Sequence, residues 1–229
     1  MIKTSYLTEL FLPIEFDNLL KELKLPEDIC KLHIGDSVSY FYDRYNEDYK
    51  DNCDTINSMM QVMLNDITYS QSIMCLKYNS RPDEDKTRFT IYAPTEGIFE
   101  MFCNIYERDP NTHKNTNYIP TDEEIKEYFK LMLRHEIGHV IDRKQVIEEL
   151  GKTKAIEFFD KQNETDFKKY YLYMDSIDDI DNDLEYYSKS CHAYYDMEVE
   201  RKANEATNVN VERLIELELK VRIGINAQH

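Results

Sequence analysis

Residues 121–151 read TDEEIKEYFKLMLRHEIGHVIDRKQVIEELG, and this stretch decides the fold. Thr121 and Glu124 have the spacing of a capping box, and Gly151 is typical of a helix end. Apolar residues recur between them at intervals of three and four, which is the pattern of one buried helix face. These residues are Ile125, Phe129, Met132, Leu133, Ile137, Val140 and Ile141. The pattern predicts a helix from about 122 to 150.

This expected helix contains the sequence His135-Glu136-Ile137-Gly138-His139. Two histidines four residues apart on a helix point the same way, so both can reach one Zn²⁺ at about 2.0–2.1 Å. The Glu136 carboxylate lies beside them and reaches a water bound to the metal. As a general base it can accept the proton of that water and pass it to a leaving amine. Gly138 would let a neighbouring strand or a substrate approach closely.

A catalytic zinc site needs a third protein ligand and one open position. Asp142 and Gln145 stand where the pattern H-E-x-x-H-x-x-G-x-x-H requires Gly and His, which excludes that arrangement. The best candidate is Glu200 on a second helix, where the small Ala203 would permit close packing. Asn204, four residues after Glu200, could accept a hydrogen bond from a ligand imidazole and fix its tautomer. Four alternatives to Glu200 stay open: Asp196, Glu198, Glu205 and His192.

H-E-I-G-H, a long gap and then E-x-x-A-N at 200–204 together resemble the gluzincin peptidases, in which the third ligand is a helical Glu. HEIGHVID is similar to the catalytic domain of anthrax lethal-factor-type peptidases. E-x-x-A-N is similar to the ImmA/IrrE-type metallopeptidases of phage and mobile elements. The resemblance covers 121–208 and implies a zincin-like fold, bound zinc and peptide-bond hydrolysis. The gap from His139 to Glu200 is longer than in compact members, which indicates a lid or an insertion at about 152–190.

Peptide hydrolysis also needs a hydrogen-bond donor that stabilises the oxyanion opposite the metal. Lethal-factor-like enzymes use a Tyr shortly before the third ligand, and here Tyr194 and Tyr195 precede Glu200 by six and five residues. If one helix covers this stretch, His192 lies on the same face as Glu200. We therefore expect Tyr195 or His192 to line the cleft as a catalytic residue. Packing is the alternative role for any one of the 18 tyrosines.

The whole chain is expected to form one α+β, zincin-like domain. It would be mainly helical, with a small, mostly antiparallel sheet packed on the helix of His135 and His139. The edge strand of this sheet would bind an extended peptide by strand addition. The expected segments are a helical part at 1–70 with an apolar stripe at 56–64, the sheet at 71–108 with strands at 73–78, 88–93 and 98–106, metal-binding helices at 121–208, and a last helix at 209–221.

Charge and cysteine content limit the partners of the 229-residue chain. The sequence has 45 acidic against 28 basic residues and a net charge of −17, so it would repel phosphate backbones and anionic membranes. We therefore expect a protein or peptide substrate and no nucleic-acid or membrane partner. Five cysteines without a C-x-x-C pair favour reduced thiols. With no signal-peptide pattern and no long apolar run, we expect a cytoplasmic protein, although delivery into another cell stays open.

Two alternatives to a zinc peptidase fit the same motif. The first is a catalytically silent zincin-fold interaction or regulatory protein that retains zinc. The second is a metal-stabilised structural protein in which a fourth protein ligand closes the site and Glu136 is only a surface acid.

Overall fold

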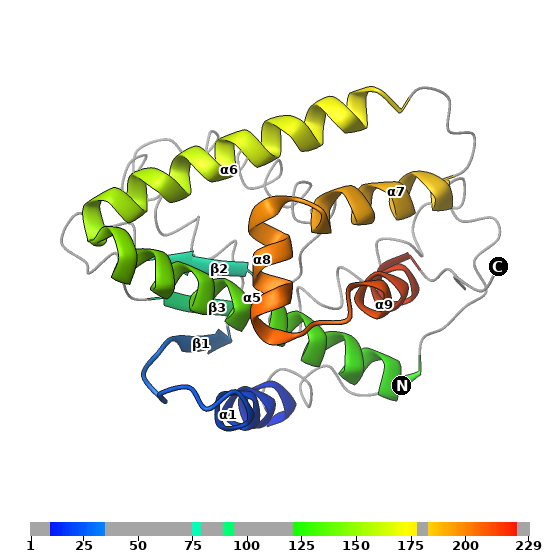
Figure 1. Ribbon diagram of the computed structural model, residues 1–229. Helices are drawn as coiled ribbons and strands as arrows, with labels where there is room; N and C mark the ends of the chain where they lie inside the picture. Colours follow the sequence, from blue (N-terminus) through cyan, green and yellow to red (C-terminus); the bar gives the residue numbers. More distant parts are fainter. Residues whose placement is uncertain (1–9, 35–74, 79–88, 94–120, 178–182, 224–229) are drawn as a thin grey trace, which may run out of the picture.

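The computed structural model describes residues 10–34, 75–78, 89–93, 121–177 and 183–223. This part of the chain is mainly helical with one small sheet (Figure 1). The expected apolar stripe at 56–64 and the expected strand at 98–106 lie outside the described residues. The elements are α1 (Leu12–Glu22), β1 (Lys31–Ile34), β2 (Cys75–Tyr78), β3 (Phe89–Ala93), α5 (Asp122–Leu150), α6 (Lys152–Asp175), α7 (Asp183–Tyr195), α8 (Glu198–Thr207) and α9 (Val211–Ile223).

Helix α5 has the bounds that the sequence predicts. Its capping box is formed on both sides: the Glu124 N–H donates to Thr121 Oγ1 over 3.2 Å, and the Thr121 N–H donates to Glu124 Oε2 over 2.9 Å. Gly151 ends the helix at a φ of 76°, a backbone conformation that favours glycine. Because α6 begins at the next residue, the chain reverses at Gly151. Figure 1 shows α6 running back across the molecule beside α7 and α8.

The sheet has the strand order β1-β3-β2 and is mixed. Strand β2 pairs with β3 in the antiparallel direction, but β1 pairs with β3 in parallel, with Leu32 opposite Ile91. The expectation of a mostly antiparallel sheet is therefore wrong. Strand β1 also lies in the part of the chain expected to be helical. A four-residue strand is too short for its apolar spacing to distinguish it from a helix turn, and its partner is far away in the sequence.

The core is built around α5. The inner face of this helix packs against α1, the sheet and α9, so that hydrophobic burial comes from segments distant in sequence. Burying each large apolar side chain stabilises the fold by about 1.5–3 kcal/mol. The largest fully buried side chains are Leu12, Leu19, Phe89, Ile91, Tyr128, Phe129, Met132, Leu133, Ile137 and Leu214.

The helical conformation is interrupted between α7 and α8. Helix α7 ends at Tyr195, and Met197 has a ψ of 141°, which is not helical. The single helix that would have placed His192 and Glu200 on one face therefore does not exist. Helix α8 packs between α5 and α6 and ends at Asn208, whose φ of 54° is left-handed. Asn is one of the few residues other than Gly that adopt this conformation readily.

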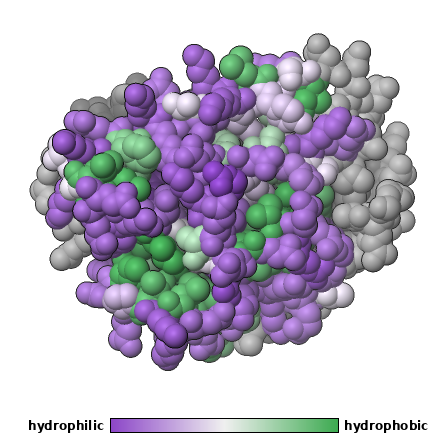
Figure 2. Space-filling view, viewed as in Figure 1, coloured by the Kyte–Doolittle hydropathy of each residue, from purple (hydrophilic) through white to green (hydrophobic). Residues whose placement is uncertain are grey.

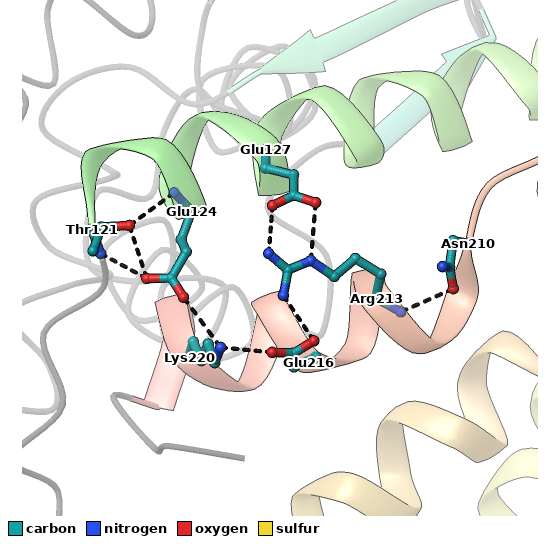
Figure 3. A network of polar contacts seen from close by, with 7 residues as sticks. All are labelled: Thr121, Glu124, Glu127, Asn210, Arg213, Glu216 and Lys220. Carbon is teal, nitrogen blue, oxygen red and sulfur yellow. Dashed lines mark hydrogen bonds and ion pairs between the residues drawn. The ribbon is translucent and has the colours of Figure 1, made fainter. Parts of the chain in front are cut away.

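An ion-pair network fastens α9 to the first turns of α5 (Figure 3). The Arg213 guanidinium donates to both carboxylate oxygens of Glu127, over 2.9 and 2.5 Å, and to Glu216 over 2.8 Å. Lys220 donates to Glu216 over 2.6 Å and to Glu124 over 3.1 Å. Glu124 thus serves both the capping box of α5 and the contact with α9.

The face seen in Figure 2 is mostly hydrophilic, with separate hydrophobic patches. The larger exposed apolar side chains include Ile14 on α1 and Tyr171 and Leu172 on α6. Among the helices in the described ranges, none combines the length and the apolar character needed to cross a bilayer.

Candidate metal centre

Three buried side chains bring their ligand atoms together between α5 and α8. Glu200 Oε2 lies 2.9 Å from His135 Nε2 and 3.1 Å from His139 Nε2. The two imidazole Nε2 atoms are themselves 3.1 Å apart. His135 is 2% exposed, His139 is 7% exposed and Glu200 is 5% exposed. This His-His-Glu group could hold a metal ion.

The spacing of these atoms fits a small cation. Ligand atoms about 2.0–2.1 Å from a tetrahedral Zn²⁺ are about 3.4 Å from one another, and the three edges of this triangle are only slightly shorter. Asn204 Oδ1 lies 2.8 Å from His135 Nδ1. Because an amide oxygen can only accept, Nδ1 carries the hydrogen, and Nε2 faces the other two ligand atoms, where its lone pair would be available to a metal ion. The expected role of Asn204 is thus consistent with its position.

The electrostatics of the triad also favour a positive charge at its centre. Burial disfavours protonation of His135, but the hydrogen bond and the charge of Glu200 outweigh it and raise the pKa to about 9. Burial lowers the pKa of His139. Burial alone would raise the pKa of Glu200, yet the two imidazoles lower it well below its usual range. The carboxylate is therefore ionised and needs a cation beside it, either a proton on His135 or a metal ion.

Close helix packing makes the triad possible. A Cβ atom on Gly138 would overlap the backbone carbonyl of Ala203, so only glycine lets α8 come this near to α5. The close neighbour of Gly138 is thus a helix, where a strand or a substrate was expected. At the far end of α8, Arg134 of α5 donates through Nε to the Thr207 carbonyl over 2.6 Å. The same α5–α8 contact that Gly138 permits brings Glu200 to the histidines.

Glu136 is the acid nearest to the triad in sequence, and it is buried at 3% exposure. Its negative charge contributes to the raised pKa of His135 and also raises the pKa of Tyr194. Glu136 therefore lies within electrostatic reach of one ligand and of one neighbouring hydroxyl. It is not the surface acid that a purely structural zinc site would allow.

The two candidate tyrosines differ in what they touch. The Tyr195 hydroxyl donates to Glu218 Oε2 over 2.8 Å, while its ring packs edge-on against the His135 ring, with centroids 5.6 Å apart. Tyr195, which was expected to be catalytic, thus has its hydroxyl bonded to Glu218 and its ring packed against His135. Burial and the charges of Glu200 and Glu136 raise the pKa of Tyr194 well above its usual value. Tyr194 is therefore the tyrosine whose hydroxyl lies within electrostatic reach of Glu200 and Glu136.

His192 does not join the site. Its imidazole is 45% exposed, its Nδ1 donates to the Ser188 carbonyl over 2.7 Å, and its Nε2 lies 3.4 Å from Glu212. The break between α7 and α8 turns it away from the face of Glu200. The other alternative ligands are exposed and outside the triad: Glu198 pairs with Lys202 over 3.0 Å, Glu205 pairs with Arg201 over 2.5 Å, and Asp196 follows the end of α7.

Comparison of the chain with protein-family models, with curated proteins and with solved structures finds no match. Only the residues and the geometry of the metal centre therefore indicate a function for this chain.

Proposed function

We propose that this protein is a zinc-dependent peptidase of the gluzincin type with a zincin-like fold. The observation that carries the proposal is the buried triangle of His135 Nε2, His139 Nε2 and Glu200 Oε2, with Glu136 next to His135. Two imidazoles and one carboxylate are a ligand set that catalytic zinc sites use, and zinc suits it better than Mg²⁺ or Ca²⁺, which prefer oxygen ligands.

The residues around the triad can take separate catalytic roles in peptide hydrolysis. A bound zinc ion would supply Lewis-acid chemistry by lowering the pKa of water and polarising a carbonyl. The Glu136 carboxylate accepts a proton from the attacking water and delivers it to the nitrogen of the leaving amine. The Tyr194 hydroxyl keeps its proton because its pKa is raised, so it can donate a hydrogen bond to the developing oxyanion.

A catalytic role is favoured over a structural one by the number of ligands. Within the described ranges, three His, Cys, Asp or Glu side chains converge on the site, not four. A tetrahedral ion held by three protein ligands has one position left for water or substrate. Among the described strands, β1 and β2 lie at the two sides of the sheet beside α5, where an extended protein or peptide substrate could pair by strand addition.

The test is the metal content and the peptidase activity of matched variants. We expect the purified wild type to contain about one zinc ion per chain and to cleave members of a mixed peptide library, with products identified by mass spectrometry. Glu136→Gln should keep the zinc and lose about 10²- to 10⁴-fold in cleavage rate, because only the base is removed. Glu148→Gln, an exposed acid on the same helix, is the control and should change neither.

The outcomes separate the proposal from its alternatives. A wild type without zinc under metal-replete conditions at neutral pH would remove the proposed function. Cleavage that persists unchanged in Glu136→Gln would remove the peptidase mechanism. A zinc-loaded wild type that cleaves no peptide or protein would favour the catalytically silent zincin-fold protein.

A further inference from the structure

Helix α8, which carries Glu200, has no N-terminal cap of its own. Met197 occupies the N-cap position, and its side chain makes no capping hydrogen bond. The first backbone N–H groups of a helix have no partner inside the helix, and a buried end without another acceptor is costly. Here the acceptor comes from α6, since the Val199 N–H donates to Asp166 Oδ2 over 3.1 Å. Asp166 lies 33 residues earlier and is only 3% exposed.

The position of Glu200 in α8 makes the cap from Asp166 relevant to the metal centre. Glu200 is the third residue of the helix, where a Glu side chain often folds back onto the backbone N–H of the N-cap residue. In this protein its Oε2 atom instead lies between His135 and His139. The Asp166 carboxylate provides both an acceptor and a negative charge at the positive end of α8. The Glu200 carboxylate is thereby left to the two imidazoles.

Asp166 is held in place by contacts on the same face of α6. Phe159 lies seven residues before it and packs under the Arg143 guanidinium of α5, 5.1 Å from the ring centroid. Tyr170 lies four residues after it and shares a 2.8 Å hydrogen bond with Ser190 of α7. Residues at these spacings share one side of a helix. Helix α6 is therefore fixed to α5 through Phe159, before Asp166, and to α7 through Tyr170, after it. Figure 1 shows α6 running alongside α7.

We propose that Asp166 is a positioning residue for the metal centre: it caps α8 from α6 and so orients the Glu200 carboxylate toward His135 and His139. This inference rests on the proposed function, because it assigns Glu200 as a metal ligand. It also assigns a role to α6. This helix lies between His139 and Glu200 in the sequence, and through Asp166 it caps the N-terminus of α8, the helix that carries Glu200. Asp166 acts through the Val199 N–H, one residue before Glu200, and is therefore not itself a catalytic residue.

The test measures metal affinity and metal coordination. Asp166→Ala removes the acceptor, and we expect the zinc dissociation constant to rise about 10- to 100-fold, the range found when a group that orients a metal ligand is lost. Asp166→Asn keeps an oxygen that can cap the helix, so its dissociation constant should stay within about threefold of wild type. At saturating Co²⁺, the visible spectrum of Asp166→Ala should differ from wild type, and that of Asp166→Asn should match it.

Glu164→Gln, an exposed acid on the same helix, is the matched control and should behave as wild type. If Asp166→Ala does not fold, Asp166→Glu takes its place, because one added methylene misplaces the acceptor while keeping the charge. The inference would be overturned if a folded Asp166→Ala or Asp166→Glu variant had the zinc affinity and the Co²⁺ spectrum of wild type. It would also be overturned if Asp166→Asn and Asp166→Ala lost zinc affinity equally. A wild type that binds neither metal would overturn the proposed function as well, so the two failures are distinguishable.

Discussion

Two polar clusters on α5 show how differently the same residue types are used along one helix. At the first turns, Glu124 and Glu127 pair with Lys220 and Arg213 of α9, and the Arg213 and Glu127 side chains are 31% and 43% exposed. In the middle, two histidines meet Glu200 of α8 at 7% exposure or less. Exposed pairs contribute about 0–1 kcal/mol each, whereas buried ionised groups are costly without a counter-charge. The first cluster attaches a helix, and the second could hold a metal ion.

The largest expected effect comes from removing the third ligand of the buried cluster. Glu200→Ala should weaken zinc binding more than 100-fold, beyond the roughly 10- to 100-fold cost of losing an outer contact, because a direct ligand is gone. Competition titration with a chromophoric chelator measures the dissociation constant. Glu198→Ala is the control from the same helix, since Glu198 is exposed and paired with Lys202. Loss of zinc in Glu198→Ala but not in Glu200→Ala would reassign the ligand.

A smaller effect is expected from the close packing that brings the buried cluster together. Gly138→Ala should lower the free energy of unfolding by about 1–3 kcal/mol, because the added methyl group overlaps the Ala203 backbone. Helix propensity alone predicts the opposite sign, a gain of about 1 kcal/mol. Urea unfolding decides between the two. Gln145→Ala, at an exposed position of α5, should stay within about 0.5 kcal/mol of wild type, and a Gly138→Ala variant that is more stable than wild type would contradict the α5–α8 contact.

The smallest effect should come from the partly exposed Arg213–Glu127 pair of the first cluster. Arg213→Ala should lower the free energy of unfolding by at most about 1 kcal/mol, and high salt should shrink the difference because it screens partly exposed charges. Zinc affinity should not change. Urea unfolding at low and high salt, together with a zinc titration, checks both statements. Arg201→Ala, which removes a single exposed ion pair with Glu205, is the control and should change the free energy of unfolding less than Arg213→Ala does. A clear loss of zinc in Arg213→Ala would show that the two clusters are coupled.

The parts predicted well from sequence are those encoded within a few residues. The bounds of α5 follow from Thr121, Glu124, Gly151 and a regular apolar stripe, all of which act locally. The spacing of His135 and His139 fixes their common face once the helix exists. Glu200 and Asn204 lie beside the histidines in the structure, as the E-x-x-A-N spacing predicts, because a second helix with small residues can approach the first.

The features that were missed depend on contacts between distant segments. Strand β1 exists through its parallel pairing with β3, which no local pattern indicates. The break after Tyr195 leaves His192 exposed and away from the triad, and neither Gly nor Pro marks that break in the sequence. Asp166 is one of many acids in a charged stretch, and only the position of α6 beside α8 distinguishes it. A Met at the N-cap of α8 is the one sequence signal that could have suggested a cap from elsewhere.

The 61-residue separation of His139 and Glu200 has a consequence for chain entropy. A metal ion bound by both would act as a cross-link that closes a long loop, and an unstructured loop of this length costs about 3.6 kcal/mol to close, apart from a constant. Helices α6 and α7 occupy most of that loop and fold it back on itself. Once these helices have formed, far fewer backbone bonds in the loop can rotate freely, so closing the loop costs less conformational entropy. The inserted helices therefore make it easier for the third ligand to reach the other two before any ion binds.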